Sequence, residues 1–390
     1  DIKNGEGVCV LDPHGDLIED ILEYVPKERV EDVILFDPSD TERPLGINML
    51  EFETQDQKTF VINEMIKIFD KLYDLKATGG PMFEQYMRNA ILLIMEDIES
   101  GSTLLEIPRV LADEDFRHYK LSKCKDYLVS DFWKKQAEKA GGEASLANMV
   151  PYITSKLTPF ISNDIMRPII SQQKSAFSFR KVMDEQKILL LNLSKGKIGE
   201  LNSSLIGMVF VGKILMSALS RVDQAEDERK NFYLYIDEFQ NFITDSIAII
   251  LSEARKYRLN LTMAHQYVTQ LIDKGDETIK DAVFGNAGTF ISFRIGVKDA
   301  EIVAKQYAPV VSEYDLINLP AFNAYIKLLI DNYNPPAFSL ETLQREKPEQ
   351  NYVKEIKELS RLKYGRDRSI VENEIRERVM KTNKIKDSVI

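Results

Sequence analysis

The stretch FYLYIDEFQNF, residues 232–242, joins a run of aromatic and aliphatic residues directly to two carboxylates, Asp237 and Glu238. A short, continuous apolar run of this kind is typical of a β-strand that is covered on both faces. In nucleotide-hydrolysing α/β folds, ligands bind at the carboxyl ends of such strands. There an Asp can hold Mg²⁺ through water, and a following Glu can orient or deprotonate the attacking water. The pattern would also arise if the two acids only capped the next helix.

Similar apolar runs recur along the chain, with helix-like segments between most of them. The other runs are residues 7–12, 33–36, 187–193, 259–264, 289–293 and 324–330. The helix-like segments are residues 16–25, 201–219, 247–256 and 297–306. This alternation predicts an α/β fold with right-handed crossovers and a mainly parallel sheet.

The alternation is interrupted between residues 54 and 185, where helical periodicity continues but no strand pattern appears. We interpret this segment as an all-α domain inserted between two strands of the sheet. The predicted organisation is the first part of a core domain (1–53), the inserted all-α domain (54–185), the remainder of the core domain (186–346) and a charged helical tail (347–390).

The composition limits the possible functions of the 390-residue chain. Its net charge of −11 argues against a surface coated with basic residues for wrapping nucleic acid, although 51 Lys and Arg leave room for a DNA path on a few loops. Two cysteines and three histidines give no disulfide framework and no Cys/His metal site. The apolar stretch 204–219 contains Lys213 and is too short to span a bilayer, which predicts a buried helix.

The strand at 259–264 is flanked by two further polar candidates. Gln266 follows this strand and should therefore lie at the same edge of the sheet as Glu238, where an amide could contact a γ-phosphate. Arg255 precedes the strand at the end of a helix, from which it could reach the phosphate of a neighbouring subunit. Each residue alone would more often be a solvated side chain, but the spacing of both after an Asp-Glu strand favours a nucleotide site.

The first strand also ends in an acid. In VLDPHGDL, residues 10–17, a buried run leads into Asp12, a Pro-His-Gly turn and Asp16, which could cap a helix. Asp12 or His14 could contribute to the nucleotide site. Turn geometry alone would also explain these residues.

The sequence contains no phosphate-binding loop of the form G-x-x-x-x-G-K-[ST]. Its Gly-Lys pairs, Gly196-Lys197 and Gly212-Lys213, are each followed by Ile and lack the required glycine spacing. We therefore expect that the 390-residue chain alone neither binds ATP tightly nor hydrolyses it.

Taken together, the motifs resemble those of the conjugative coupling-protein ATPases (TraG/TraD-like) of type IV secretion systems, within the HerA/FtsK group of DNA-pumping motors. The similar stretches are, in order, GVCVLDPHGDL, ILFDPSDTERPLGINML, ILLLNLSKGKIGE, FYLYIDEFQNF, ILSEARKYRLNLTMAHQYVTQL and GNAGTFISFRIGVKDAE. The resemblance covers most of residues 5–330 and implies a RecA-like P-loop NTPase core with an inserted all-α domain.

The resemblance also implies roles for individual residues, with ATP and Mg²⁺ as cofactors. Asp237 resembles the Walker B residue that holds Mg²⁺, and Glu238 the catalytic glutamate. Gln266 matches the sensor glutamine of motif III and Arg255 a candidate arginine finger. Arg294, after the 289–293 run, is a second finger or sensor candidate.

The implied function is an ATP-driven translocase that passes DNA through a homo-hexameric ring toward a secretion or conjugation channel, with relaxosome and channel proteins as partners. Lys195 and Lys197, expected on a flexible turn in LSKGKIGE (193–200), could contact DNA phosphates without reading sequence. A solvated turn between a strand and a helix would explain them equally well. Family members carry the phosphate loop just upstream, often behind membrane helices. We therefore expect the chain to lack an N-terminal part and to work in the cytoplasm at the inner face of the cell membrane.

Two other functions are compatible with the sequence. A HerA-like motor for DNA repair would keep the same chemistry. A docking or scaffold paralogue would have kept the fold and lost ATP binding. The missing loop favours it, and the intact Asp237, Glu238, Arg255 and Gln266 argue against it.

Overall fold

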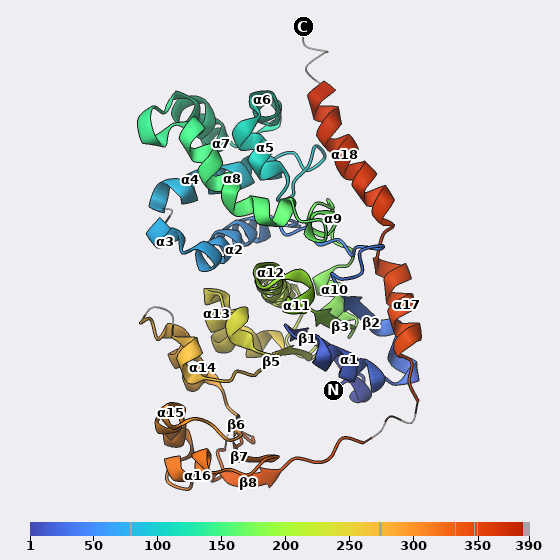
Figure 1. The fold of residues 1–390 in the computed structure, drawn as a ribbon, viewed down its shortest axis with the longest axis vertical. Helices are drawn as coiled ribbons and strands as arrows, with labels where there is room; N and C mark the ends of the chain where they lie inside the picture. Colours follow the sequence, from blue (N-terminus) through green and yellow to red (C-terminus); the bar gives the residue numbers. More distant parts are fainter. Residues whose placement is uncertain (79, 273–274, 332, 347, 349, 385–390) are drawn as a thin grey trace.

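A five-stranded parallel sheet with the strand order β2-β3-β1-β4-β5 forms the centre of the molecule (Figure 1). The computed structural model describes residues 1–78, 80–272, 275–331, 333–346, 348 and 350–384. The strands of this sheet are β1 (Gly7–Asp12), β2 (Val33–Phe36), β3 (Ile188–Asn192), β4 (Phe232–Ile236) and β5 (Leu259–Met263). The predicted α/β fold with a mainly parallel sheet is confirmed.

Helices cover both faces of this sheet, which explains the continuous apolar runs of its inner strands. On one face, Val8 and Val10 of β1 pack with α1 (Asp16–Glu23) and α17 (Val353–Tyr364). On the other face, Cys9 and Leu11 belong to a large core that includes α12 (Glu200–Leu219).

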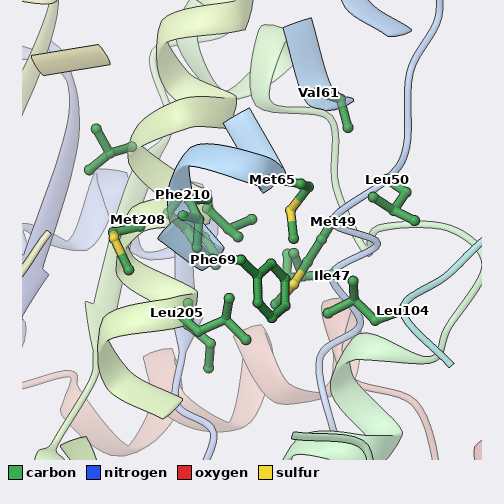
Figure 2. Packing of buried hydrophobic residues seen from close by; sticks show 14 of the residues in the cluster. Ile47, Met49, Leu50, Val61, Met65, Phe69, Leu104, Leu205, Met208 and Phe210 are labelled. Carbon is green, nitrogen blue, oxygen red and sulfur yellow. The ribbon is translucent and has the colours of Figure 1, made fainter. Parts of the chain in front are cut away.

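Among the described residues between β2 and β3, all regular structure is helical. The helices α2 to α8 lie at one end of the molecule, whereas α10 lies beside the sheet (Figure 1). The α-helices are α2 (Gln55–Tyr73), α3 (Leu75–Thr78), α4 (Gly80–Met95), α5 (Glu106–Ala112), α6 (Glu114–Lys123), α7 (Tyr127–Asp131), α8 (Leu146–Ile161), α9 (Met166–Ile170) and α10 (Phe179–Asp184). Figure 2 shows α2 residues such as Met65 and Phe69 beside Leu205 and Phe210 of α12. One hydrophobic core thus continues from the sheet into the helices, and the domain boundaries at 53/54 and 185/186 stay predictions.

Helix α12 is buried, as the sequence predicts. It is the one described helix long and apolar enough to cross a membrane, but 78% of its apolar window lies inside the fold. Lys213 donates from Nζ to the carbonyl oxygen of Glu51 at 2.6 Å, and burial lowers the pKa of its ammonium to about 8.

The last two predicted strands lie outside the main sheet, in an antiparallel sheet of order β6-β7-β8. Its strands are β6 (Phe290–Ser292), β7 (Asn323–Lys327) and β8 (Phe338–Glu341), preceded by α14 (Thr278–Asn286). One face packs on α15 (Val297–Tyr307) and α16 (Glu313–Ile317), as seen in Tyr307, whose hydroxyl donates to Ser292 Oγ at 2.8 Å. The alternating burial along β7 marks a half-covered strand, in contrast to the fully covered β1 and β3.

Two C-terminal helices run along one side of the molecule (Figure 1). Helix α17 lies beside the edge strand β2, where Leu35 N donates to Ser360 Oγ at 2.8 Å. Helix α18 (Arg368–Lys384) reaches the helical end, where Arg378 Nε donates to the buried carboxylate of Glu106 at 3.0 Å. The two C-terminal helices thus link the parallel sheet to the helical end of the molecule.

Candidate nucleotide site

The candidate site is the carboxyl edge of the parallel sheet, where four neighbouring strands end together. Asp12, the last residue of β1, is paired with Asn192, the last residue of β3. Ile236 is paired with Leu11 on one side and with Met263 on the other, so Asp237 follows in line. Gln266 comes just after β5 at the same edge. The strand register therefore brings Asp12, Asp237, Glu238 and Gln266 together, as the sequence predicts.

The acidic pair lies on a tightly fixed turn. Asp237 N donates to Leu11 O at 3.0 Å, and Phe239 N donates to Ala264 O at 2.9 Å. Between these two anchors, Glu238 has φ 46° and ψ 48°, in the left-handed region. A residue with a side chain pays about 1–3 kcal/mol for such a conformation, so the surrounding contacts must hold it there.

Two glutamine amides hold the carboxylate of Glu238. Gln266 Nε2 donates to Oε1 at 2.6 Å, and Gln240 Nε2 donates to Oε2 at 2.5 Å. With both carboxylate oxygens bound, the direction of the Glu238 side chain is fixed. Gln266 was expected here, whereas Gln240 was missed, although its position two residues after Glu238 puts it on the same turn.

The carboxyl group of Asp237 has a raised pKa. Burial raises the pKa of its carboxyl group, and the neighbouring carboxylates of Asp12 and Glu238 raise it further. No salt bridge to Asp237 occurs within the described part of the chain. A half-buried acid with like charges beside it fits a divalent cation. Mg²⁺ usually binds through one or two carboxylates plus substrate phosphates. The described residues contain no group of three His, Cys, Asp or Glu that could hold a metal ion.

The raised pKa gives a prediction for Asp237→Asn. A carboxyl group whose folded pKa exceeds its unfolded value supports folding below the unfolded pKa and loses that contribution as pH rises through the folded pKa. Without a bound cation, Asp237→Asn should therefore be more stable than the wild type at pH 7, and the difference should vanish below about pH 4. Urea unfolding at several pH values measures this.

Asp315→Asn is the control with the opposite sign. Hydrogen bonds from the side chain and backbone of Ser312 lower the pKa of Asp315. This variant should be less stable than the wild type at pH 7. If Asp237→Asn did not raise the free energy of unfolding at pH 7, burial and neighbouring carboxylates would not destabilise the charged form of Asp237.

Asp12 caps helix α1. Its buried carboxylate accepts hydrogen bonds from the backbone N–H groups of His14, Leu17 and Ile18 at 2.8, 2.9 and 3.3 Å. The N-cap residue is Gly15, whereas Asp16, the expected cap, is the first helical residue. The side chain of Asp12 accepts from the free N–H groups of the first turn in place of an N-cap side chain. A contribution of Asp12 to the nucleotide site remains a prediction, supported by the position of its carboxylate beside Asp237.

The two arginine candidates lie away from the acidic pair. Arg255 is exposed in a short 3-10 helix, Ala254–Tyr257, that leads into the amino end of β5, at the opposite edge of the sheet. Arg294 is exposed just after β6 in the antiparallel sheet. Within the described residues, no hydrogen bond or salt bridge joins either guanidinium to Asp237 or Glu238.

The two lysines lie on a short helix, α11 (Lys195–Ile198), rather than on a flexible turn. Lys195 Nζ donates to Asn241 Oδ1 at 2.8 Å, and Asn241 Nδ2 donates to Glu238 O at 2.8 Å. Lys197 is exposed, with Nζ 3.5 Å from Ser39 Oγ. Lys195 is thus connected to the acidic turn through one side chain.

Comparison with known proteins gives three kinds of match. Residues 231–318 match the family described as the TraM recognition site of TraD and TraG. A stretch of 106 residues is 26% identical to an uncharacterized protein of Mycoplasma pneumoniae and covers 26% of this chain and 71% of that protein.

Among solved structures, the fold is similar to that of the bacterial conjugative coupling protein TrwB in its unbound form, with a TM-score of 0.62 at 14% identity over 89% of this chain and 82% of that one. TrwB in complex with ADP and Mg²⁺ gives a TM-score of 0.64 at 15% identity over 90% and 81%. VirB4 of Thermoanaerobacter pseudethanolicus gives 0.55 at 14% identity over 83% and 79%. The family resemblance and the RecA-like core inferred from the sequence are thereby confirmed.

Proposed function

We propose that the chain is a member of the conjugative coupling-protein and type IV secretion ATPases, and that it is an ATP-driven motor that moves DNA toward a conjugation or secretion channel. The observation that carries the proposal is the acidic pair at the carboxyl edge of the sheet, with Glu238 held by Gln266. The pair lies inside the matched segment 231–318.

In this proposal the residues of the edge divide the work of ATP hydrolysis. Mg²⁺ supplies charge neutralisation for the phosphates when it is bound. Asp237 holds a water ligand of the ion, and the carboxylate of Glu238 orients and deprotonates the attacking water. Gln266 fixes Glu238 and contacts the γ-phosphate. The solved complex of the similar protein TrwB with ADP and Mg²⁺ supports nucleotide and Mg²⁺ as ligands.

The exposed arginines suggest how subunits could cooperate. Neither Arg255 nor Arg294 reaches the acidic pair of its own chain among the described contacts. We assign them to the phosphates of a neighbouring subunit, where a guanidinium would stabilise charge in the transition state. Such head-to-tail contacts close into a ring, here a homo-hexamer.

The proposed motor contacts DNA and partner proteins. Lys195 and Lys197 would contact DNA phosphates, and the bond from Lys195 to Asn241 would connect those contacts to Glu238. The TraM recognition described for the matched family supports relaxosome contact through residues 231–318, next to contact with channel proteins. The motor would work at the inner face of the cell membrane.

The test is ATP turnover with and without DNA. The 390-residue chain, which contains no phosphate loop, should give none. The complete gene product should turn over ATP faster with DNA, provided that the gene encodes a G-x-x-x-x-G-K-[ST] loop. Lys195→Ala and Lys197→Ala should weaken DNA binding for all sequences and lower its salt slope by about one each. If the complete gene encodes no such loop and its product shows no ATP turnover, the motor function is wrong and the protein is a docking protein.

A further inference from the structure

Glu64 of α2 is a buried carboxylate whose two oxygens both bind the segment that follows the acidic pair. Oε1 accepts from Thr244 Oγ1 at 2.9 Å, and Oε2 accepts from Ser246 Oγ at 2.5 Å. Glu64, Thr244 and Ser246 are 6%, 5% and 1% exposed. A buried polar group is costly to leave unpaired, so these two hydrogen bonds hold the segment firmly against α2.

The two hydroxyls lie at the end of the acidic turn. Thr244 is the N-cap of α13 (Asp245–Glu253), and its Oγ1 also accepts from Ser246 N at 3.3 Å. The turn is thus fixed at its start by the sheet, through Asp237 N and Leu11 O, and at its end by Glu64. Glu238 lies between these two anchors in its left-handed conformation.

Helix α12 is shaped to admit both partners. A Cβ atom at Gly212 would lie 2.9 Å from Glu64 Cγ. A Cβ atom at Gly207 would lie 2.2 Å from Cδ1 of Phe242, which belongs to the turn. Glycine at these positions lets α2 and the turn approach each other over the surface of α12.

We propose that Glu64 is a positioning residue for the acidic pair, and that through it the helical end of the molecule and the catalytic edge respond to each other. Glu64 acts by fixing Thr244 and Ser246, which hold the turn that carries Asp237 and Glu238. Because α2 is part of the helical segment, a displacement of that helix would reach the turn directly. The role in catalysis rests on the function proposed above, whereas the mechanical coupling does not.

Hydrogen exchange of the amides in residues 237–246 tests the coupling on the chain itself. Glu64→Ala should speed this exchange about 10- to 100-fold, because two buried hydroxyl groups lose their acceptor. The milder variant Glu64→Gln keeps the shape and one acceptor oxygen, and should give a smaller increase in a chain that remains folded.

Glu106→Gln is the matched control. Glu106 is also fully buried, and it accepts from Thr103 Oγ1 at 2.7 Å and from Arg378. This variant should lower stability without a selective increase in exchange at 237–246. Equal increases in the two glutamine variants would reduce Glu64 to a general structural residue and overturn the proposal.

The opposite side of the contact gives a second test. Thr244→Val with Ser246→Ala should reproduce the increase seen in Glu64→Ala, and combining all three changes should add little. Independent, additive increases would contradict a shared interaction.

In a form of the protein that hydrolyses ATP, Glu64→Gln should lower kcat by about tenfold and leave KM nearly unchanged, since it displaces a group used in the transition state. If no form of the protein hydrolyses ATP, the proposed function fails and the exchange result still stands. If ATP turns over normally in Glu64→Gln with unchanged exchange, the motor stands and the role of Glu64 fails.

Discussion

Glu238→Gln should lower ATP turnover by about 10²- to 10⁴-fold and leave nucleotide affinity almost unchanged, in any form of the protein that hydrolyses ATP. The substitution keeps the size of the side chain, so the turn should survive. It removes the carboxylate that is assigned to take a proton from water, since Asp237 is assigned to the metal side. Steady-state turnover and nucleotide titration separate the two effects.

Two comparisons make this result specific. Glu253→Gln removes a carboxylate that is exposed and paired with Lys256 at 3.2 Å, away from the acidic pair, and should leave turnover unchanged. Gln240→Ala frees one carboxylate oxygen of Glu238 and keeps the charge, so it should cost clearly less than Glu238→Gln. Turnover in Glu238→Gln close to that of the wild type would remove this residue from the chemistry.

The parallel sheet could be predicted because each of its strands is marked by an apolar run in the sequence. β1 and β3 are buried throughout, and their apolar runs have no gaps. A polar residue directly after such a run must lie at the carboxyl edge, which is why Asp12, Asp237 and Gln266 could be assigned to one site. The antiparallel sheet was harder to predict, because β6 and β8 are short and neither contains a fully buried residue. Their pairing depends on β7, whose alternating pattern was interpreted as a run.

The parts of the site that escaped prediction depend on contacts between distant segments. Glu64 appears in the sequence as one acid on an amphipathic helix, and nothing near it points to Thr244. Lys195 was expected on a flexible turn, yet its amine is directed to Asn241. Arg255 could be located before its strand, but only the register shows that this places it at the opposite edge from Asp237. Sequence patterns therefore predict well which residues lie at which edge of the sheet. The partners of their side chains can be identified only from the three-dimensional structure.

Gly207→Ala should destabilise the protein by about 1–3 kcal/mol, because its added methyl group would lie 2.2 Å from the ring of Phe242 in a filled core. The ring is completely buried, so it can give way only by moving the acidic turn. Urea unfolding measures the loss in stability. Hydrogen exchange at 237–246 should increase in the same variant.

The expected loss can be separated from a simple effect on helix α12. Gly285→Ala adds the same methyl group within α14, where no atom lies within 4 Å, and should stabilise the chain by up to about 1 kcal/mol through helix propensity. Phe242→Leu provides space at Gly207, so the double variant should recover part of the loss, as expected for residues in direct contact. Full additivity of the two changes would mean that α12 and the turn adjust independently. In that case the position of Asp237 and Glu238 would be set by the sheet alone, since no constraint would reach them through the core.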